Sequence, residues 1–184
     1  MEWNYHDRDL SNSWMSWIES NPKGTREEVC SFIKEWIEKV QPISLLDIGC
    51  GQGACSELVN KDIEYKGIDP CAIFIKQAKK LLTSSNKFFT EGNAYKIPFV
   101  NKTVDAVMSI WVWHYLANVE LAAKEMRRIL KPGGRFLIIA NNPGTENHME
   151  EAIIRSSLTI DHIGKLGEID SSGDGLYIVI EGKR

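Results

Sequence analysis

Several features of common protein classes are missing from this chain. No apolar run approaches the ~20 residues that a membrane-spanning helix needs, and residues 1–7 have neither the basic start nor the apolar centre of a secretory signal. Lys and Arg (22) do not outnumber Asp and Glu (25), and the net charge is −3. Because proteins that bind phosphate backbones usually carry a basic excess, the composition disfavours nucleic acid as a partner, although it leaves a local basic patch open.

Cysteine is scarce and shows no metal-binding pattern. Cys30, Cys50, Cys55 and Cys71 form no C-x-x-C pair, so we expect no metal site and free thiols in a reducing cytoplasm. The remaining composition, 43% hydrophobic and 26% charged, is ordinary for a globular protein. A length of 184 residues is enough for one domain with a substantial core and short for two.

The most informative stretch is residues 43–53, Ile-Ser-Leu-Leu-Asp-Ile-Gly-Cys-Gly-Gln-Gly. Its apolar start is typical of a strand buried on both faces of a parallel sheet. Gly49, Gly51 and Gly53 follow at alternate positions, and glycine lets a backbone adopt positive φ and lie close to a ligand. The spacing differs from the dinucleotide pattern G-x-G-x-x-G, and residues 54–55 lack the Lys-Ser/Thr of a P-loop. The alternative is a strand–turn–helix corner without a ligand.

Helical and extended patterns alternate along the chain. After a turn at 21–24, Thr25-x-x-Glu28 reads as a capping box that starts a packing helix, which ends before Pro42. Strands are predicted at 43–48, 63–69, 87–90, 103–110, 135–140, 158–169 and 176–181, helices at 54–61, 71–83, 118–130 and 146–157, and a turn at 131–134. This order predicts a Rossmann-like α/β fold: a mostly parallel seven-stranded sheet with helices on both faces and an antiparallel C-terminal edge.

Ligands of such sheets bind at the carboxyl ends of the strands. Asp69 ends the second predicted strand, at the spacing from Gly49 expected of an acid that accepts hydrogen bonds from two ribose hydroxyls. The alternative is a turn-forming Asp before Pro70.

Five landmarks together resemble the class I S-adenosylmethionine-dependent methyltransferases, in particular the small methyltransferase-domain type. They are the acid-x-Gly-x-Gly-x-Gly run from Asp47, the acid Asp69, the turn 92–94, the segment 109–116 and the Leu-Lys-Pro-Gly-Gly-Arg run at 130–135, so the resemblance spans about residues 43–143. One departure is Asn93, where the family commonly has an Asp that accepts from the adenine amine. An amide oxygen can accept this bond without charge assistance.

The resemblance implies S-adenosyl-L-methionine as cofactor and S-adenosyl-L-homocysteine as product. The cofactor-binding residues that it implies are Asp47, Gly49, Cys50, Gly51, Gly53, Asp69, Pro70, Asn93, Ala94, Ser109, Ile110 and Trp111.

Alignment of the acceptor behind an activated methyl group supplies most of the catalysis. Positioning lowers the activation barrier by roughly 7–11 kcal/mol. A general base increases the rate by only about 10²–10⁴-fold, so a base is not required. His114 is the best candidate base because imidazole titrates near neutrality; the alternative is a helix-start histidine held by packing. Asn141, just beyond the fifth strand, either orients a polar group of the substrate or makes the turn.

Aromatic residues are the remaining candidates for substrate binding. Trp111 and Trp113 share a side if their segment is extended, and form either an aromatic wall near the sulfonium or a core pair. Trp14 and Trp17 lie in an aromatic N-terminal segment, either a lid over the site or a helix pinned to the domain.

We therefore predict one domain over 1–184: an aromatic arm (1–24), a cofactor-binding core (25–143) and a C-terminal helix and hairpin (144–184). The predicted activity is in-line transfer of a methyl group to an oxygen or nitrogen of a small molecule, by a cytoplasmic monomer or homodimer with no membrane or nucleic-acid partner. Three alternatives remain: a methyltransferase acting on protein or RNA, a non-catalytic cofactor-binding module and, more distantly, an NAD oxidoreductase.

Overall fold

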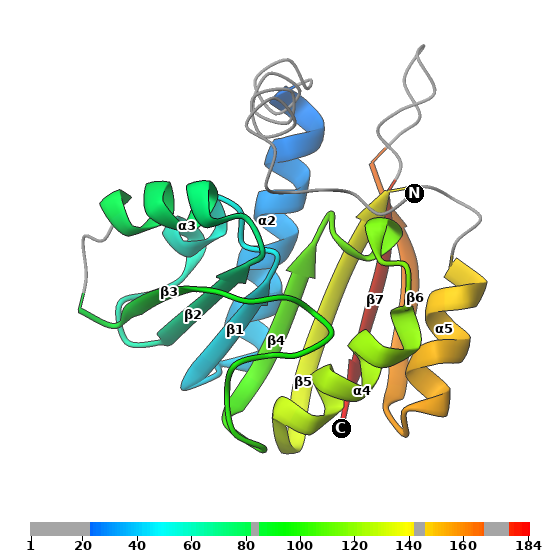
Figure 1. The fold of residues 1–184 in the computed structure, drawn as a ribbon. Coiled ribbons are helices and arrows are strands. Elements are labelled where there is room, and N and C mark those ends of the chain that lie inside the picture. The colour runs from blue at the N-terminus through cyan, green and yellow to red at the C-terminus, as the bar shows by residue number, and fades with distance from the viewer. Residues whose placement is uncertain (1–22, 82–84, 142–145, 168–176) are drawn as a thin grey trace.

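A computed structural model of the chain describes residues 23–81, 85–141, 146–167 and 177–184. Seven strands form one sheet in the order β3-β2-β1-β4-β5-β7-β6 (Figure 1). The strands are β1 (Ser44–Ile48), β2 (Glu64–Asp69), β3 (Lys87–Glu91), β4 (Val104–Ile110), β5 (Leu130–Asn141), β6 (Thr159–Leu166) and β7 (Tyr177–Lys183). Strands β1 to β5 pair in parallel, whereas β7 is antiparallel to both β5 and β6. The predicted fold class and its antiparallel C-terminal edge are confirmed.

The strand order reverses at β1. The chain moves outward from β1 to β2 and β3, then returns to place β4 and β5 on the other side of β1. In open parallel sheets this reversal opens a crevice at the carboxyl ends of the two strands beside it. The ends of β1 and β4 are therefore where the topology positions a ligand.

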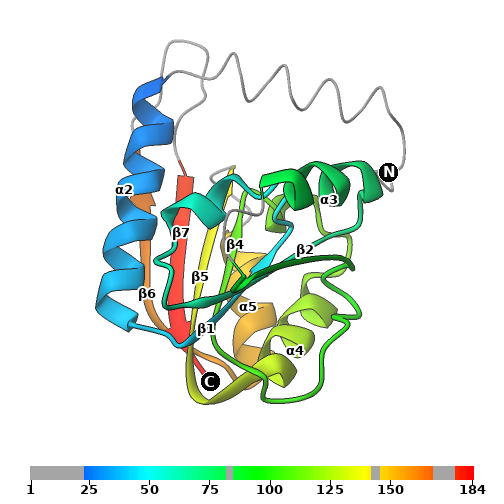
Figure 2. The ribbon, with the colours of Figure 1, turned by 90° about the vertical axis from the view of Figure 1, so that its left-hand side faces the viewer.

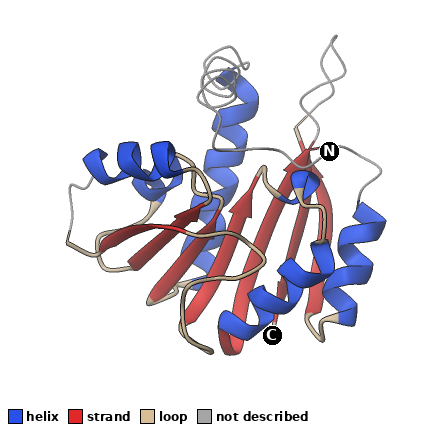
Figure 3. Ribbon diagram, viewed as in Figure 1, coloured by secondary structure: helices blue, strands red, loops and turns tan. Residues whose placement is uncertain are grey.

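Helices cover both faces of the sheet (Figures 2 and 3). They are α2 (Lys23–Val40), α3 (Ala72–Ala78), α4 (Val119–Ile129) and α5 (Glu146–Arg155), with 3₁₀ turns η1 (Ala54–Leu58), η2 (Lys79–Leu81) and η3 (Trp113–Tyr115). Within the described ranges, no helix has both the length and the apolar character that crossing a membrane requires.

Two apolar clusters hold these layers together. Successive residues of a strand point to opposite faces, so Leu45 packs into the cluster that contains Ile33 of α2, and Leu46 into the one that contains Met126 of α4 and Ile153 of α5. All five residues of β1 are buried, as expected of a strand covered on both faces. The site at its carboxyl end is thus attached to a fully buried strand.

The helix before β1 differs from its prediction at its N-terminal end. The chain is already helical at Lys23, so Thr25 lies inside α2 and cannot be its N-cap, and residues 23–24 are not in a turn. The spacing of the apolar residues predicts that a helix forms, but it does not determine the residue at which the helix begins. The C-terminal end is as predicted: α2 ends at Val40, and Gln41 adopts a left-handed φ of 48° before Pro42.

Three other boundaries are also corrected. Segment 54–61 forms only the 3₁₀ turn η1, and the described part of the predicted helix 71–83, residues 71–81, forms a short α3 followed by the 3₁₀ turn η2. The predicted turn at 131–134 lies within β5, where the register jumps from Leu130 opposite Val104 to Arg135 opposite Ala106. The Lys-Pro-Gly-Gly sequence therefore forms an irregularity in a paired strand.

Candidate active site

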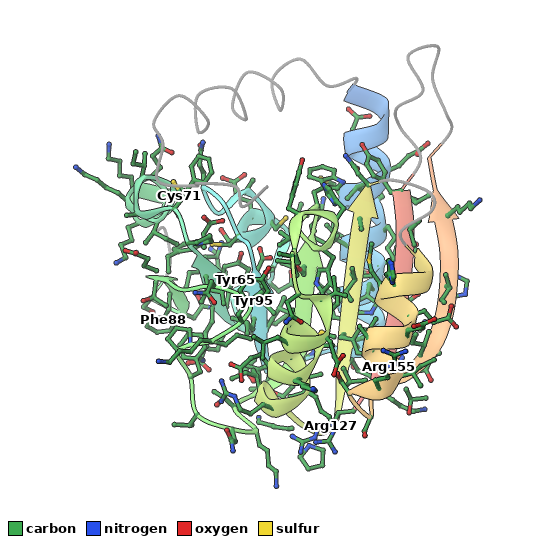
Figure 4. All side chains as sticks on the ribbon, turned by 45° about the vertical axis from the view of Figure 1, so that its right-hand side comes forward. Tyr65, Cys71, Phe88, Tyr95, Arg127 and Arg155 are labelled. Carbon is green, nitrogen blue, oxygen red and sulfur yellow. The ribbon has the colours of Figure 1, made fainter. Side chains whose placement is uncertain are left out.

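The carboxyl ends of β1 to β4 carry the predicted cofactor residues. Segment 47–53 begins in the last two residues of β1, 69–70 begins at the last residue of β2, 93–94 follows β3, and 109–111 begins in the last two residues of β4. Because these strands are parallel and adjacent, the structure brings the four segments to one edge of the sheet. Cys71 marks this edge in Figure 4, and Arg127 and Arg155 mark the opposite end of the domain.

The three glycines of the turn all have positive φ, with values of 76° for Gly49, 52° for Gly51 and 86° for Gly53. The backbone N–H groups of Gly49 and Cys50 both donate to Ile68 O, at 2.8 and 2.9 Å, which fixes the turn to β2. This conformation strains any side chain other than glycine.

The three glycines differ in what a side chain would meet. An added Cβ at Gly49 would lie 2.2 Å from Val112 Cγ2, and one at Gly53 would lie 2.8 Å from Phe89 Cζ. At Gly51 an added Cβ would meet nothing within 4 Å. Gly49 and Gly53 are therefore required for packing, whereas Gly51 faces open space.

The carboxylate of Asp69 ties the glycine turn to the start of α3. Its Oδ2 accepts from Gly51 N at 3.0 Å and its Oδ1 accepts from Cys71 N at 2.8 Å. Burial raises the pKa of Asp69, and the two N–H donors counteract part of this rise. A carboxylate has about four acceptor positions, so two bonds to the backbone leave room for the predicted bonds to ribose. The bond to Cys71 N is also the turn contact that the alternative interpretation expects.

Asp47 lies beneath the turn rather than at its surface. It is 1% exposed, and its Oδ2 accepts from the Tyr65 hydroxyl at 2.6 Å. Burial raises the pKa of Asp47 to about 7, against the lowering effect of Tyr65, and nearby Asp69 raises it further. Sequence reasoning missed Tyr65, labelled in Figure 4. No local pattern identifies it, because the contact joins residues 18 apart on neighbouring strands.

The turn after β3 uses the side chain of Asn93 for its own construction. Asn93 Oδ1 accepts from Tyr95 N at 2.9 Å and from Lys96 N at 3.0 Å. Both lone pairs of the amide oxygen are thus engaged, which argues against the predicted bond to an adenine amine. Ala94 is buried. The Tyr95 hydroxyl, which sequence reasoning also missed, accepts from Ala117 N at 2.8 Å and links this turn to the segment after β4 (Figure 4).

The end of β4 combines a buried anchor with a strained turn. Ser109 is fully buried and its Oγ donates to Ile48 O at 2.9 Å, which joins β4 to β1. Ile110 is 7% exposed. Trp111 has a φ of 59°, and its backbone N–H donates to Ile139 O at 2.6 Å. A bulky residue with positive φ is a genuine outlier, and such strain gathers at functional sites.

The strained turn separates the two tryptophans. Trp111 packs with the cluster on the α2 side, with its ring 5.6 Å from that of Tyr177, whereas Trp113 is 1% exposed in the cluster on the α4 side. The predicted aromatic wall of both residues is therefore wrong, because the positive φ at Trp111 and the 3₁₀ turn η3 break the period of two. Trp113 is a core residue.

His114, in η3, meets Asn141, the last residue of β5. His114 Nδ1 accepts from Asn141 N at 3.3 Å, and the imidazole lies against the ring of Tyr115 with centroids 4.0 Å apart. Burial lowers the pKa of His114 to about 4, so the imidazole is neutral near pH 7. The sequence prediction that both residues belong near the site agrees with this placement, and their roles stay predictions.

Two predicted substrate residues, Trp14 and Trp17, lie outside the described residues. In the part of the chain that the structure describes, no three His, Cys, Asp or Glu side chains gather into a potential metal site.

Comparison with known proteins identifies the family. Residues 46–138 match the model of the methyltransferase domain. An uncharacterised methyltransferase of Mycobacterium bovis is 27% identical over 135 residues, which cover 73% of this chain and 54% of the relative. A fatty-acid O-methyltransferase of Mycolicibacterium smegmatis is 28% identical over 102 residues, which cover 54% of this chain and 37% of the relative. The chain thus spans about half the length, or less, of these relatives.

Among solved structures, the [4+2]-cyclase SpnF superimposes with a TM-score of 0.72 at 14% identity, covering 84% of this chain and 81% of the cyclase. This likeness concerns the fold alone, since one fold hosts several chemistries. The match of the family model extends over half of the sequence and includes the glycine turn, strands β2 to β4 and most of β1 and β5. The chain therefore belongs to the methyltransferase-domain family.

Proposed function

We propose that this protein is an S-adenosylmethionine-dependent methyltransferase that methylates an oxygen or nitrogen of a small molecule and releases S-adenosylhomocysteine. The observation that carries the proposal is the glycine turn at the strand-order reversal. Position 51 has a left-handed φ of 52°, which favours glycine, and nothing packs against the place of the missing Cβ of Gly51. At the strand-order reversal, such an open backbone is what a cradle for a ligand requires.

The residues around this cradle fit the cofactor. The backbone of Gly51 is open to a ligand, and Asp69 holds that backbone in place while keeping two acceptor positions. Asp69 is thus suited to accept from ribose hydroxyls. When bound, the sulfonium of S-adenosylmethionine supplies an already activated methyl group.

The residues of the chain then have one main task, which is to hold the acceptor in line. The strained Trp111 and the neighbouring His114 stand at the end of β4, beside the reversal point, and Asn141 stands at the end of β5. Rigid placement of an acceptor by such groups is worth roughly 7–11 kcal/mol. This is why we assign the catalytic contribution to positioning rather than to a strong base.

Charge and connectivity support a small acceptor. The net charge of −3 gives no general attraction for nucleic acid. In the described part of the chain, β5 ends at Asn141 and α5 begins at Glu146, so no substrate-binding domain is inserted after β5. We further propose a cytoplasmic location, in keeping with the buried free thiols of Cys50 and Cys71, and a monomer or homodimer.

Two measurements test the proposal. Calorimetry with S-adenosylhomocysteine and with NAD should show binding of the first only. Incubation with methyl-labelled S-adenosylmethionine should then label compounds in a cell extract that has been filtered to remove macromolecules. Label found only in the RNA or protein fraction would move the acceptor to those classes, and binding without any turnover would make the protein a cofactor-binding module.

A further inference from the structure

The buried polar atoms without a hydrogen-bond partner include two on contacting residues at the carboxyl edge. Counted over the residues that the structure describes, His114 Nε2 and Asn141 Oδ1 are both buried and unpaired. The two residues are in direct contact, because Asn141 N donates to His114 Nδ1 at 3.3 Å. A buried polar group without a partner costs about 1–3 kcal/mol, and native proteins tolerate few of them. Two on touching residues require an explanation.

The hydrogen bond from Asn141 N determines which imidazole nitrogen carries the proton. In a neutral imidazole one nitrogen is a donor and the other an acceptor. Since Nδ1 accepts from the backbone, we assign the proton to Nε2. His114 therefore presents an N–H donor at Nε2 and has no free lone pair with which to act as a base. Contact with the Tyr115 ring explains the position of the imidazole but leaves this N–H unsatisfied.

The amide oxygen of Asn141 is the matching acceptor. The ends of β4 and β5 are held together by the bond from Trp111 N to Ile139 O, so the pair stands on a fixed frame next to the reversal point of the sheet. Neither atom has exposed surface, so bulk solvent does not reach them. A bound molecule that satisfies both atoms must accept one hydrogen bond and donate another.

We propose that His114 Nε2–H and Asn141 Oδ1 together bind a hydroxyl or a primary amide group of the methyl acceptor. The inference rests on the proposed function, because it takes the molecule bound at this edge to be the acceptor. A carboxylate has no hydrogen for Asn141, and an apolar group leaves both atoms unpaired. The pair thus selects acceptors that carry a neutral group with both a donor and an acceptor.

The test uses the protein saturated with S-adenosylhomocysteine and four probes of similar size: benzyl alcohol, benzamide, toluene and benzoate. Nitrogen-15 NMR of the histidine rings reports the tautomer of His114, assigned by the loss of its signals in His114→Gln. We expect the Nε2–H tautomer, and a shift of this signal with benzyl alcohol or benzamide only. In Asn141→Leu, which keeps the backbone bond to Nδ1, the effective probe should bind about tenfold more weakly.

The outcomes separate this inference from the proposed function. A protein that does not bind S-adenosylhomocysteine refutes the proposed function. A protein that binds it, but shows an Nδ1–H tautomer, no response to either polar probe or an equal response to toluene, refutes the inference alone.

Once a labelled acceptor is found, two substitutions of His114 distinguish a donor from a base. The side-chain amide of Gln can donate from nearly the position of Nε2 but cannot take a proton at neutral pH. His114→Gln should therefore keep most of kcat/KM, whereas His114→Phe should lose tenfold or more. Equal losses in the two variants would indicate a base and overturn the assignment.

Discussion

Substitution of Gly51 by alanine tests the cradle directly. Gly51 has a φ of 52°, and an added Cβ meets no protein atom within 4 Å. The cost to folding is therefore limited to the left-handed backbone of an L-residue, about 1–2 kcal/mol. The new methyl group would stand in the space that we assign to the cofactor. Overpacking of a fitted site costs typically 1–3 kcal/mol, which weakens binding by roughly 5- to 150-fold.

The chain provides a matched control at the other end of β5. Gly133 has a φ of 75°, and an added Cβ there also meets nothing within 4 Å. Gly133→Ala should lose a similar amount of stability and no affinity for S-adenosylhomocysteine. Urea unfolding measures the first quantity and calorimetry the second. If Gly51→Ala binds the nucleoside as tightly as Gly133→Ala does, the open space at Gly51 is not the cofactor site.

Three further predictions concern polar groups at the same edge. Asp69→Ala should weaken S-adenosylhomocysteine binding by about 1–3 kcal/mol in calorimetry, and near-wild-type affinity would refute its role. Because the folded-state pKa of Asp47 is raised to about 7, the folded protein binds more protons than the unfolded chain between about pH 4 and 7. The stability of wild type relative to Asp47→Asn should therefore fall as pH rises through this window in urea unfolding, and a constant difference would contradict the shift. Burial lowers the folded-state pKa of His114 from 6.5 to about 4. Wild type should therefore lose stability relative to His114→Gln as pH falls from 6.5 to 4. An NMR titration of His114 with a midpoint near 6.5 would refute the burial argument.

The arrangement of the strands was predictable because it follows from alternation. Apolar runs separated by helical segments favour parallel pairing with crossovers. The glycine turn after the first run and the acid at the end of the second mark the carboxyl edge. The sequence predicted seven strands and an antiparallel edge, and both are confirmed. It did not indicate that β7 is inserted between β5 and β6, since strand order depends on packing between distant segments.

Inside the site, sequence reasoning failed where one residue depends on distant partners. The hydrogen bond between Asp47 and Tyr65 joins the neighbouring strands β1 and β2, and no local sequence pattern predicts it. Trp111 and Trp113 share a face only if the backbone between them is regular, and a single φ of 59° removed that regularity. Asn93 carries the right functional group for a ligand contact, but its own turn uses both lone pairs. Motifs thus indicated the candidate site at the carboxyl edge, whereas the direction of each side chain required the structure.

The physical cause of the pKa shifts distinguishes the two ends of the sheet. Among the groups that the structure describes, some have a pKa whose net shift favours the neutral form, with burial as its main cause. These groups lie around the glycine turn and the segment after β4: Asp47, Cys50, Tyr65, Asp69, His114 and Tyr115.

At the opposite end, charged partners dominate. Hydrogen bonding to Arg128 lowers the pKa of Glu125, and Glu125 raises that of Arg128, with N–O distances of 2.7 Å. Burial acts to raise the pKa of Asp105, but Lys131 and Ser44 outweigh it and the pKa is lowered. Ion pairs of this kind are common on protein surfaces. Polar groups that are buried without charged partners reduce stability, and they often mark functional sites. These shifts therefore support the proposed binding site at the carboxyl edge on grounds other than the glycine motif.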